Sequence, residues 1–400
     1  MRIAYVCADP GVPVFGTKGC SIHVQEVIRA LRHHEAQIEL FAARRGGRAP
    51  ADLEWLRVHD LPAVPKGDFA AREQAALAAN DELYATLERA PRFDLVYERY
   101  SLWSHAGMAY ARAQGARGVL EVNAPLIEEQ AEHRGLCDRA AAEWVATRVF
   151  GAASVLIAVS AEVAAYLGRF PVARGRVHVV PNGVNPERFP VDQLPSRPGG
   201  PETFTVGFVG TLKPWHGLPT LVDAFALLHE QDSTTRLLVV GDGPERLGLE
   251  TSLTARGLLD AVHLSGAVAP EDVPGLLASM DVAVAPYPEL SRFYFSPLKV
   301  YEYLAAGRPV VASRIGQLAD LLVDGVNGSL CPPGDAVVLA DTLRRLRADP
   351  ELRARLGRNG RATVLCHHCW TGVARRILDL AGFGSTLQPS RVATTSIVGG

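Results

Sequence analysis

The stretch FPVDQLPSRPGGPE, residues 189–202, divides this sequence into two similar parts. It is rich in proline and glycine and has no apolar periodicity, which is typical of a linker. On both sides of it, short apolar runs alternate with helical patterns, as parallel strands alternate with their connecting helices. We therefore predict an α/β fold with two Rossmann-like, doubly wound domains that face each other across a cleft.

The apolar runs define the domains. They are IAYVCA (3–8), IELFAA (38–43), LVYE (95–98), GVLEV (118–122) and VLIAVS (155–160) in the first half, and TVGFVG (205–210), RLLVVG (236–241), AVHLSG (261–266), DVAVAP (281–286), PVVAS (309–313) and GSLCPP (328–333) in the second. We predict an N-terminal domain over 1–190, a linker over 191–202, a C-terminal domain over 203–365, a helix over 366–384 that packs back toward the N-terminal domain, and a mobile tail over 385–400.

The composition is that of a globular protein, with 48% apolar and 21% charged residues. A formal net charge of −2 argues against a dominant surface for nucleic acid or for an anionic membrane. The start of the chain has no secretory pattern and there are six cysteines, so we expect a cytoplasmic protein with reduced thiols. In CHHC (366–369) the ligands are too few and too close together for a tetrahedral zinc site, so we expect it to pack in a late helix.

The segment SPLKVYEYLAAGRPVVAS (296–313) indicates what the cleft binds. Ser296 before proline predicts a capped helix start, which places Lys299 in the first turn. A cation there opposes the helix dipole, unless an anion is held between it and the free backbone amides. Glu302, one turn further along, can accept hydrogen bonds from two ribose hydroxyls. The pattern therefore predicts that the cleft binds a nucleotide.

Two glycine-containing loops supply further candidate groups. GTKGCS (16–21) precedes a helix, and its glycines allow the backbone to approach an anionic or sugar group. GTLKPWHG (210–217) follows the first strand of the second half and carries Lys213 and His216, which either contact phosphate or lie on the surface. Neither loop has the G-x-G-x-x-G pattern, so a nicotinamide enzyme is a poor candidate.

The order and spacing of several motifs resemble those of the family 4 glycosyltransferases of GT-B fold, over nearly the whole chain to about Leu380. These motifs are GTKGCSIHVQEVIRAL (16–31), VVPNGVNPERF (179–189), VVGDGPERLGLE (239–250), VHLSGAV (262–268), SPLKVYEYLAAGRPVVAS (296–313) and VDGVNGSLCPPGD (323–335). The resemblance implies a nucleotide-sugar donor in the C-terminal half, an acceptor in the N-terminal half, transfer with retention of configuration, and no metal or other cofactor. The sequence has no D-x-D pair.

The resemblance also implies roles for single residues of the donor site. Glu302 matches the second glutamate of an E-x7-E element, while Tyr294 stands where the first is expected and Glu289 can substitute for it. Thr211 and His216 stand where an arginine and a lysine are common, so Lys213 and Lys299 are expected to restore the positive charge. The full donor-binding set is Gly16, Gly19, Thr211, His216, Gly266, Val268, Glu289, Tyr294, Ser296, Leu298 and Glu302, with the 266–268 loop on the base.

In the N-terminal half, Asn123 of VLEVNAP (119–125) replaces a histidine that many members carry near the reacting sugar. Asparagine cannot be a general base, but it can hydrogen-bond the donor sugar or the acceptor, or simply cap the turn. Glu98 and Arg99 either face the acceptor or pair with each other. Glu98 is a candidate for acceptor activation, and Arg99, Tyr100 and Asn123 form the expected acceptor-binding set. We expect His23 to have a packing role.

These observations predict a retaining transfer of a hexosyl group from a nucleoside-diphosphate sugar, with UDP favoured, to a hydroxyl of a small molecule or a glycan. Backbone amides at Gly19 and Leu298, with Lys213, Lys299 and His216, would stabilise the leaving diphosphate, which can itself take the acceptor's proton. Two alternatives stay open: a non-catalytic nucleotide-sugar-binding partner subunit, and a sugar-nucleotide epimerase of the same fold. Acceptor-dependent release of nucleotide excludes the first, and donor consumption without acceptor indicates the second.

Overall fold

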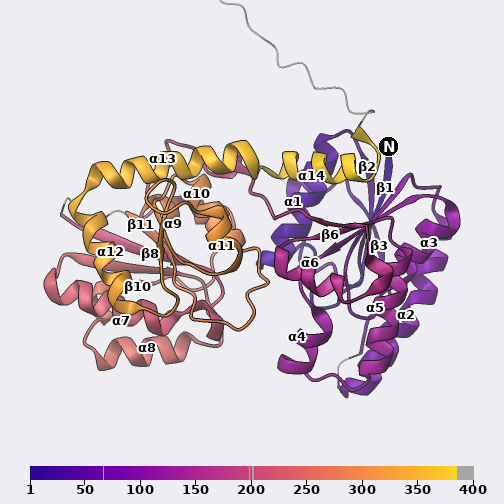
Figure 1. The fold of residues 1–400 in the computed structure, drawn as a ribbon, viewed down its shortest axis with the longest axis horizontal. Helices are drawn as coiled ribbons and strands as arrows, with labels where there is room; N and C mark the ends of the chain where they lie inside the picture. The colour runs from indigo at the N-terminus through magenta and orange to yellow at the C-terminus, as the bar shows by residue number, and fades with distance from the viewer. Residues whose placement is uncertain (66, 198, 201, 385–400) are drawn as a thin grey trace, which may run out of the picture.

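The structure is a computed structural model that describes residues 1–65, 67–197, 199–200 and 202–384. Within them the chain forms two parallel sheets, each in its own half (Figure 1). This confirms the predicted fold class of two doubly wound α/β halves. The mobile tail predicted over 385–400 lies outside the described residues.

The N-terminal half has a seven-stranded sheet in the order β3-β2-β1-β4-β5-β6-β7. Its strands are β1 (Arg2–Cys7), β2 (Gln37–Ala42), β3 (Arg57–Asp60), β4 (Leu95–Arg99), β5 (Arg117–Val122), β6 (Val155–Ala158) and β7 (Val177–Val179), and its helices are α1 (Gly19–His33), α2 (Phe69–Arg89), α3 (Ala106–Gln114), α4 (Leu126–His133), α5 (Arg139–Ala152) and α6 (Ala161–Gly168). Ile3 and Tyr5 of β1 join one core, and Ala4 and Val6 join another on the opposite face. A strand buried on both faces reads as a continuous apolar run, which is why the sequence reveals it.

The C-terminal half has a six-stranded sheet in the order β10-β9-β8-β11-β12-β13. Its strands are β8 (Phe204–Val209), β9 (Thr235–Val240), β10 (Val262–Leu264), β11 (Val282–Ala285), β12 (Val310–Ser313) and β13 (Ser329–Cys331), and its helices are α7 (Leu218–Gln231), α8 (Arg246–Ala255), α9 (Val273–Ala278), α10 (Leu298–Ala305), α11 (Gly316–Leu321), α12 (Ala336–Ala348) and α13 (Pro350–His367). The two cores of this half lie on opposite faces of its sheet.

Both sheets reverse their strand order next to their first strand, between β1 and β4 and between β8 and β11. Open parallel sheets bind ligands at such a switch point, beyond the carboxyl ends of the strands. The loops that follow β1, β4, β8 and β11 are therefore the ones that the fold places for binding.

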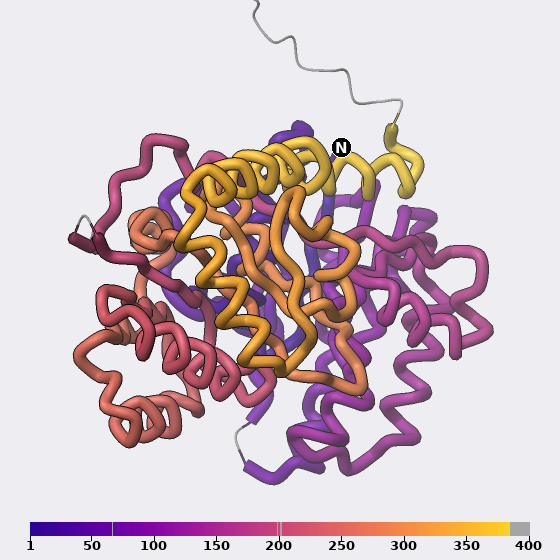
Figure 2. The backbone as a smooth tube through the Cα atoms, turned by 60° about the vertical axis from the view of Figure 1, so that its left-hand side comes forward, coloured from indigo at the N-terminus to yellow at the C-terminus, as the bar shows by residue number. Residues whose placement is uncertain are grey.

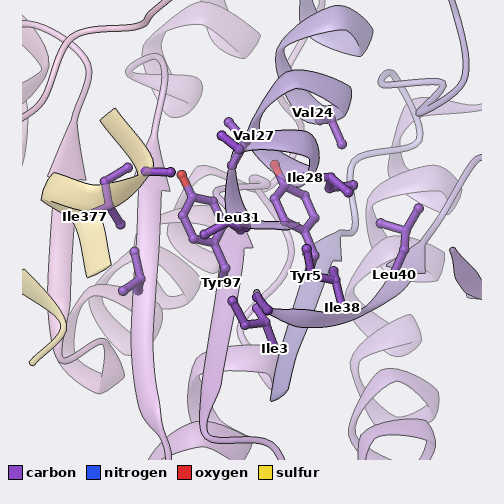
Figure 3. Packing of buried hydrophobic residues seen from close by; sticks show 14 of the residues in the cluster. Ile3, Tyr5, Val24, Val27, Ile28, Leu31, Ile38, Leu40, Tyr97 and Ile377 are labelled. Atoms are coloured by element: carbon purple, nitrogen blue, oxygen red, sulfur yellow. The ribbon is translucent and has the colours of Figure 1, made fainter. Parts of the chain in front are cut away.

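The last helix, α14 (Trp370–Leu380), belongs to the core of the N-terminal half, although it follows the C-terminal half in the chain. Figure 1 shows α13 leading across to α14, which lies near α1, and Figure 2 shows both along one edge of the molecule. Ile377 of α14 joins the cluster of Leu31, Tyr97 and their neighbours (Figure 3). The two halves are thus connected twice, by the 189–202 segment and by α14.

Candidate functional site

The start of α10 lies where the halves meet, and Ser296 connects them. The Oγ of Ser296 accepts a hydrogen bond from the backbone N–H of Asn182 at 3.1 Å, and its carbonyl accepts one from the Asn182 side chain at 3.2 Å. The N-cap residue of α10 is Pro297, without a side-chain cap. The predicted hydroxyl cap is therefore wrong, because the Ser296 side chain is used for a contact with the other half.

Lys299, in the first turn of α10, holds a buried ammonium at the carboxyl end of β8. Among the described residues its Nζ has no hydrogen-bond partner, and it lies 4.2 Å from the centroid of the Phe208 ring and 5.3 Å from that of Tyr287. A Cβ placed on Gly210 would be 3.1 Å from this Nζ. Burial lowers the pKa of Lys299 to about 7. A buried cation without a hydrogen bond is unfavourable, and an anion held at this position would relieve the cost.

His216 is neutral in this structure. Its Nδ1 lies 2.5 Å from the carbonyl oxygen of Thr211, and since a carbonyl only accepts, Nδ1 carries the proton. Burial and the charges of Lys299 and Lys213 lower the pKa of His216 to about 3. A neutral His216 adds no positive charge to this loop. The half-buried Lys213, whose Nζ lies 5.5 Å from the centroid of the Trp215 ring, does carry a positive charge.

Glu302 does not pair with Lys299, although both lie on α10. Its Oε1 accepts a hydrogen bond from Arg188 at 3.1 Å, in an ion pair that is about one fifth exposed. Burial raises the pKa of Glu302, while Arg188 acts in the opposite direction. Arg188 was not among the predicted site residues. It stands in the PNGVNPERF motif, but spacing along the chain does not show that this arginine reaches α10.

The predicted glycine loop and the start of α10 come together across the halves. A Cβ on Gly19, the first residue of α1, would lie 3.8 Å from the Cδ1 of Leu298, the first residue of α10. A Cβ on Gly16 would lie 2.9 Å from the Oγ of Ser21, so this position has no room for a side chain. Two helix N-termini from different halves therefore meet here, and free N–H groups at helix N-termini favour an anion.

The loop predicted to hold the base follows β10. Gly266 has a φ of 69°, which favours glycine, and its carbonyl accepts a hydrogen bond from Gly241 at 2.9 Å. Val268 packs half-buried against the core of this half. Glu289, the predicted substitute for the missing carboxylate, is exposed on the loop that follows β11.

Tyr294 reaches out of its own half. Its hydroxyl donates to the Oε2 of Glu129 on α4 at 3.1 Å, and its carbonyl accepts from the Oγ of Ser160 at 3.0 Å. Its ring packs against the second core of the N-terminal half. At the position where the family's carboxylate is expected, this chain therefore has a contact between the halves.

Buried polar groups occupy the carboxyl ends of β4 and β5. Arg99 donates to His23 Nδ1 at 3.1 Å, so His23 Nε2 carries the proton and faces Glu121 Oε1 at 3.0 Å and Asn182 Oδ1 at 3.1 Å. Burial raises the pKa of Glu121, but His23, Arg99 and the Asn123 amide outweigh it and the pKa is lowered. His23 thus makes a polar network in addition to its edge contact with Trp370.

Glu98 and Tyr100 lie inside the N-terminal half, which corrects the expectation that they face the acceptor. Glu98 is fully buried and accepts a hydrogen bond from Ser104 Oγ at 2.5 Å, and burial raises its pKa to about 7. Tyr100 is 4% exposed and packs against Phe150. Glu98 and Arg99 do not pair either, because successive side chains of a strand point to opposite faces.

A cavity of about 310 Å³ lies at the switch point of the N-terminal sheet, between the loops after β1 and β4 and helices α2 and α4. Most of its lining is apolar, including Leu102 and Trp103, and Asp9, Arg72 and Glu129 are among the polar groups. This size suits one small molecule. These residues could not be predicted together from the sequence, because the lining comes from segments that are far apart in the chain.

The described part of the chain contains no group of three or more His, Cys, Asp or Glu side chains placed to hold a metal ion. None of its helices combines the length and apolarity needed to cross a membrane.

Two family models match the chain, one in each half. Glycosyltransferase Family 4 matches residues 17–188, and Glycosyl transferases group 1 matches residues 203–349.

Several curated relatives are sugar transferases by name. The alpha-D-kanosaminyltransferase and the 2-deoxystreptamine glucosyltransferase of Streptomyces kanamyceticus are each 31% identical, over 43% and 58% of this chain. The matched regions span 42% and 60% of those two proteins, about half of their length. The D-inositol 3-phosphate glycosyltransferase of Salinispora arenicola is 28% identical over 94% of this chain and 90% of its own.

Solved structures share the fold. Sucrose-phosphate synthase of Thermosynechococcus elongatus superposes with a TM-score of 0.72 and 22% identity, covering 97% of this chain and 100% of that one. The Anabaena protein HepE, solved with UDP-glucose, has a TM-score of 0.68 and 22% identity, covering 96% and 99%.

Proposed function

Because the chain belongs to the family 4 glycosyltransferases, we propose that it transfers a hexosyl group from a nucleoside-diphosphate sugar to a hydroxyl of a small molecule or glycan, with retention of configuration. The donor lies at the start of α10, and the acceptor lies in the cavity at the switch point of the N-terminal sheet. No step of the proposal needs a metal ion.

The buried ammonium of Lys299 is the observation that carries this proposal. It has no hydrogen-bond partner among the described residues, and it lies beside the place where the N-termini of α1 and α10 meet. A leaving diphosphate would supply the missing negative charge, and the preorganised cation would stabilise it in the transition state. Glu302, one turn deeper, would accept the ribose hydroxyls.

UDP is the first nucleotide to test, since HepE shares the fold and was solved with UDP-glucose. For the acceptor, the cavity of about 310 Å³ favours a compact molecule over a long glycan segment. Two relatives are named for 2-deoxystreptamine and D-inositol 3-phosphate, which are small polyhydroxylated rings.

The cytoplasm remains our proposed location, supported by six cysteines that are all free thiols.

Thermal unfolding with nucleoside diphosphates and their sugars tests the donor site, with Glu302→Gln as the variant. A ligand at 100 times its Kd stabilises the folded state by about 2.7 kcal/mol, so the midpoint should rise by a few degrees for the wild type and less for the variant. Exposed Arg197 provides a matched control, Arg197→Met, which should respond like the wild type. If no nucleotide raises the midpoint, the transferase proposal loses its donor site.

Release of the nucleoside diphosphate then separates the remaining alternatives. Release that depends on an added cyclitol or sugar acceptor supports transfer. Binding without release would instead indicate a nucleotide-sugar-binding subunit, and consumption of the sugar nucleotide without acceptor would indicate an epimerase.

A further inference from the structure

Arg188 lies in the short 3₁₀ helix Pro186–Arg188, just before the segment that links the halves. One guanidinium nitrogen lies 3.1 Å from Glu302 Oε1, and the other donates to the Pro270 carbonyl at 3.2 Å. Arg188 therefore touches both the proposed ribose carboxylate and the loop after β10, which is proposed to hold the base.

A second carboxylate, that of Glu26 in the N-terminal half, lines the same cavity as Arg188. Glu26 of α1 is 3% exposed and pairs with Arg29 at 2.9 Å, and Arg29 in turn pairs with Asp52 at 2.6 Å. Burial raises the pKa of Glu26, whereas Arg29 and Arg188 act to lower it. Burial likewise raises the pKa of Glu302, Arg188 acts to lower it, and Glu26 raises it further.

The guanidinium of Arg188 thus acts on two carboxylates, one from each half of the molecule. Without it, Glu302 would lose its ion-pair partner and would still be repelled by the charge of Glu26. Buried carboxylates in that situation take up protons, because a neighbouring like charge disfavours ionisation. A protonated Glu302 would accept ribose hydroxyls less well.

We propose that Arg188 is a positioning residue that holds Glu302 ionised and oriented for the ribose, and that it joins the donor site to α1 by charge. This inference rests on the proposed function. Arg188 uses one oxygen of the carboxylate, which leaves the other free for the nucleotide. A cavity of about 870 Å³, lined by Glu26, Arg188 and Pro270 among others, gives water and protons access to the junction.

The test is the Kd of UDP as a function of pH, measured by calorimetry from about pH 5 to about pH 9. UDP binding should weaken at the acid end as Glu302 takes up a proton. In Arg188→Met, the pH below which UDP binding weakens should be higher by about one unit, which is the usual effect of losing an opposite charge. Arg188→Lys should restore much of the wild-type profile. The titration of UDP's own phosphate is common to all variants and cancels in the comparison.

Two further variants sharpen the assignment. Arg197→Met, an exposed arginine of the same linking segment, should keep the wild-type profile. In Glu26→Gln, the pH below which UDP binding weakens should be lower, because the variant removes a like charge that raises the pKa of Glu302. This variant carries the test by itself if Arg188→Met does not fold.

An unchanged pH profile in Arg188→Met and in Glu26→Gln would overturn the inference, while leaving the proposed function in place if wild-type UDP binding and transfer hold. Tighter UDP binding by Arg188→Met at all pH values would also overturn it, since Arg188 would then compete for the ribose site. Absence of binding of any nucleoside diphosphate by the wild type would overturn both the inference and the proposed function.

Discussion

At the scale of single residues, Lys299 combines a cost to folding with a proposed role in catalysis. Its pKa is lowered to about 7 by burial, so above that pH the folded protein keeps the amine neutral while the unfolded chain still binds the proton. Its contribution to stability therefore rises with pH from about 7 until the amine of the unfolded chain also loses its proton, near pH 10.4.

Lys299→Met should remove this cost. We expect the variant to be more stable than the wild type by about 1–3 kcal/mol at pH 6, with the difference shrinking toward pH 10. Transfer activity should fall by about 10²–10³-fold, as for loss of one preorganised charge or donor. Denaturant unfolding at both pH values and a transfer assay check the two expectations.

Lys299→Arg, which keeps the charge, should show no gain in stability. A variant that lost both stability and activity would show that Lys299 is mainly structural.

At the scale of elements, α14 completes the core of the N-terminal half. Ile377 is 1% exposed in that cluster, so Ile377→Ala should destabilise the protein by about 2–5 kcal/mol. Leu365→Ala on α13, where the leucine is 43% exposed, is the control and should change the free energy of unfolding by less than about 0.5 kcal/mol. Equal effects in urea unfolding would contradict this packing role of α14.

The elements also show what a sequence pattern detects. The strands predicted from apolar runs all exist, but β3 (Arg57–Asp60) and β7 (Val177–Val179) were not predicted. β3 has the sequence RVHD, with two exposed and two half-buried residues, and it lies at one edge of the sheet, while β7 lies at the other edge. An edge strand needs no apolar run, because one side of it has no neighbouring strand to bury it.

At the scale of the whole molecule, the loop after β11 connects the C-terminal half to the N-terminal half. Tyr294 hydrogen-bonds Glu129, which lines the cavity and pairs with Arg134 at 2.7 Å. Gln317 of α11 adds a buried hydrogen bond to the Val159 carbonyl at 2.7 Å. Movement of one half relative to the other would therefore break contacts at the cavity of the N-terminal half.

Tyr294→Phe should mainly affect the acceptor side. Loss of the hydroxyl should raise KM for the acceptor by roughly threefold to tenfold, the equivalent of one hydrogen bond of about 0.5–1.5 kcal/mol. The Kd of UDP, measured by calorimetry, should stay within about twofold of the wild type on the same argument, since the hydroxyl faces α4. A large loss of UDP affinity with an unchanged acceptor KM would instead assign Tyr294 to the donor site, as first expected from the sequence.

The two α/β halves and the family could be predicted from the sequence, because buried parallel strands, glycine turns and helix starts are local patterns. The folded structure was needed to see that Arg188 pairs with Glu302 and that Tyr294 hydrogen-bonds Glu129. It was also needed to see that Lys299 has no hydrogen-bond partner among the described residues. In both pairs, Arg188 with Glu302 and Tyr294 with Glu129, the partners are more than a hundred residues apart in the chain. Burial and pairing depend on side chains brought together from different elements, and no local pattern encodes them.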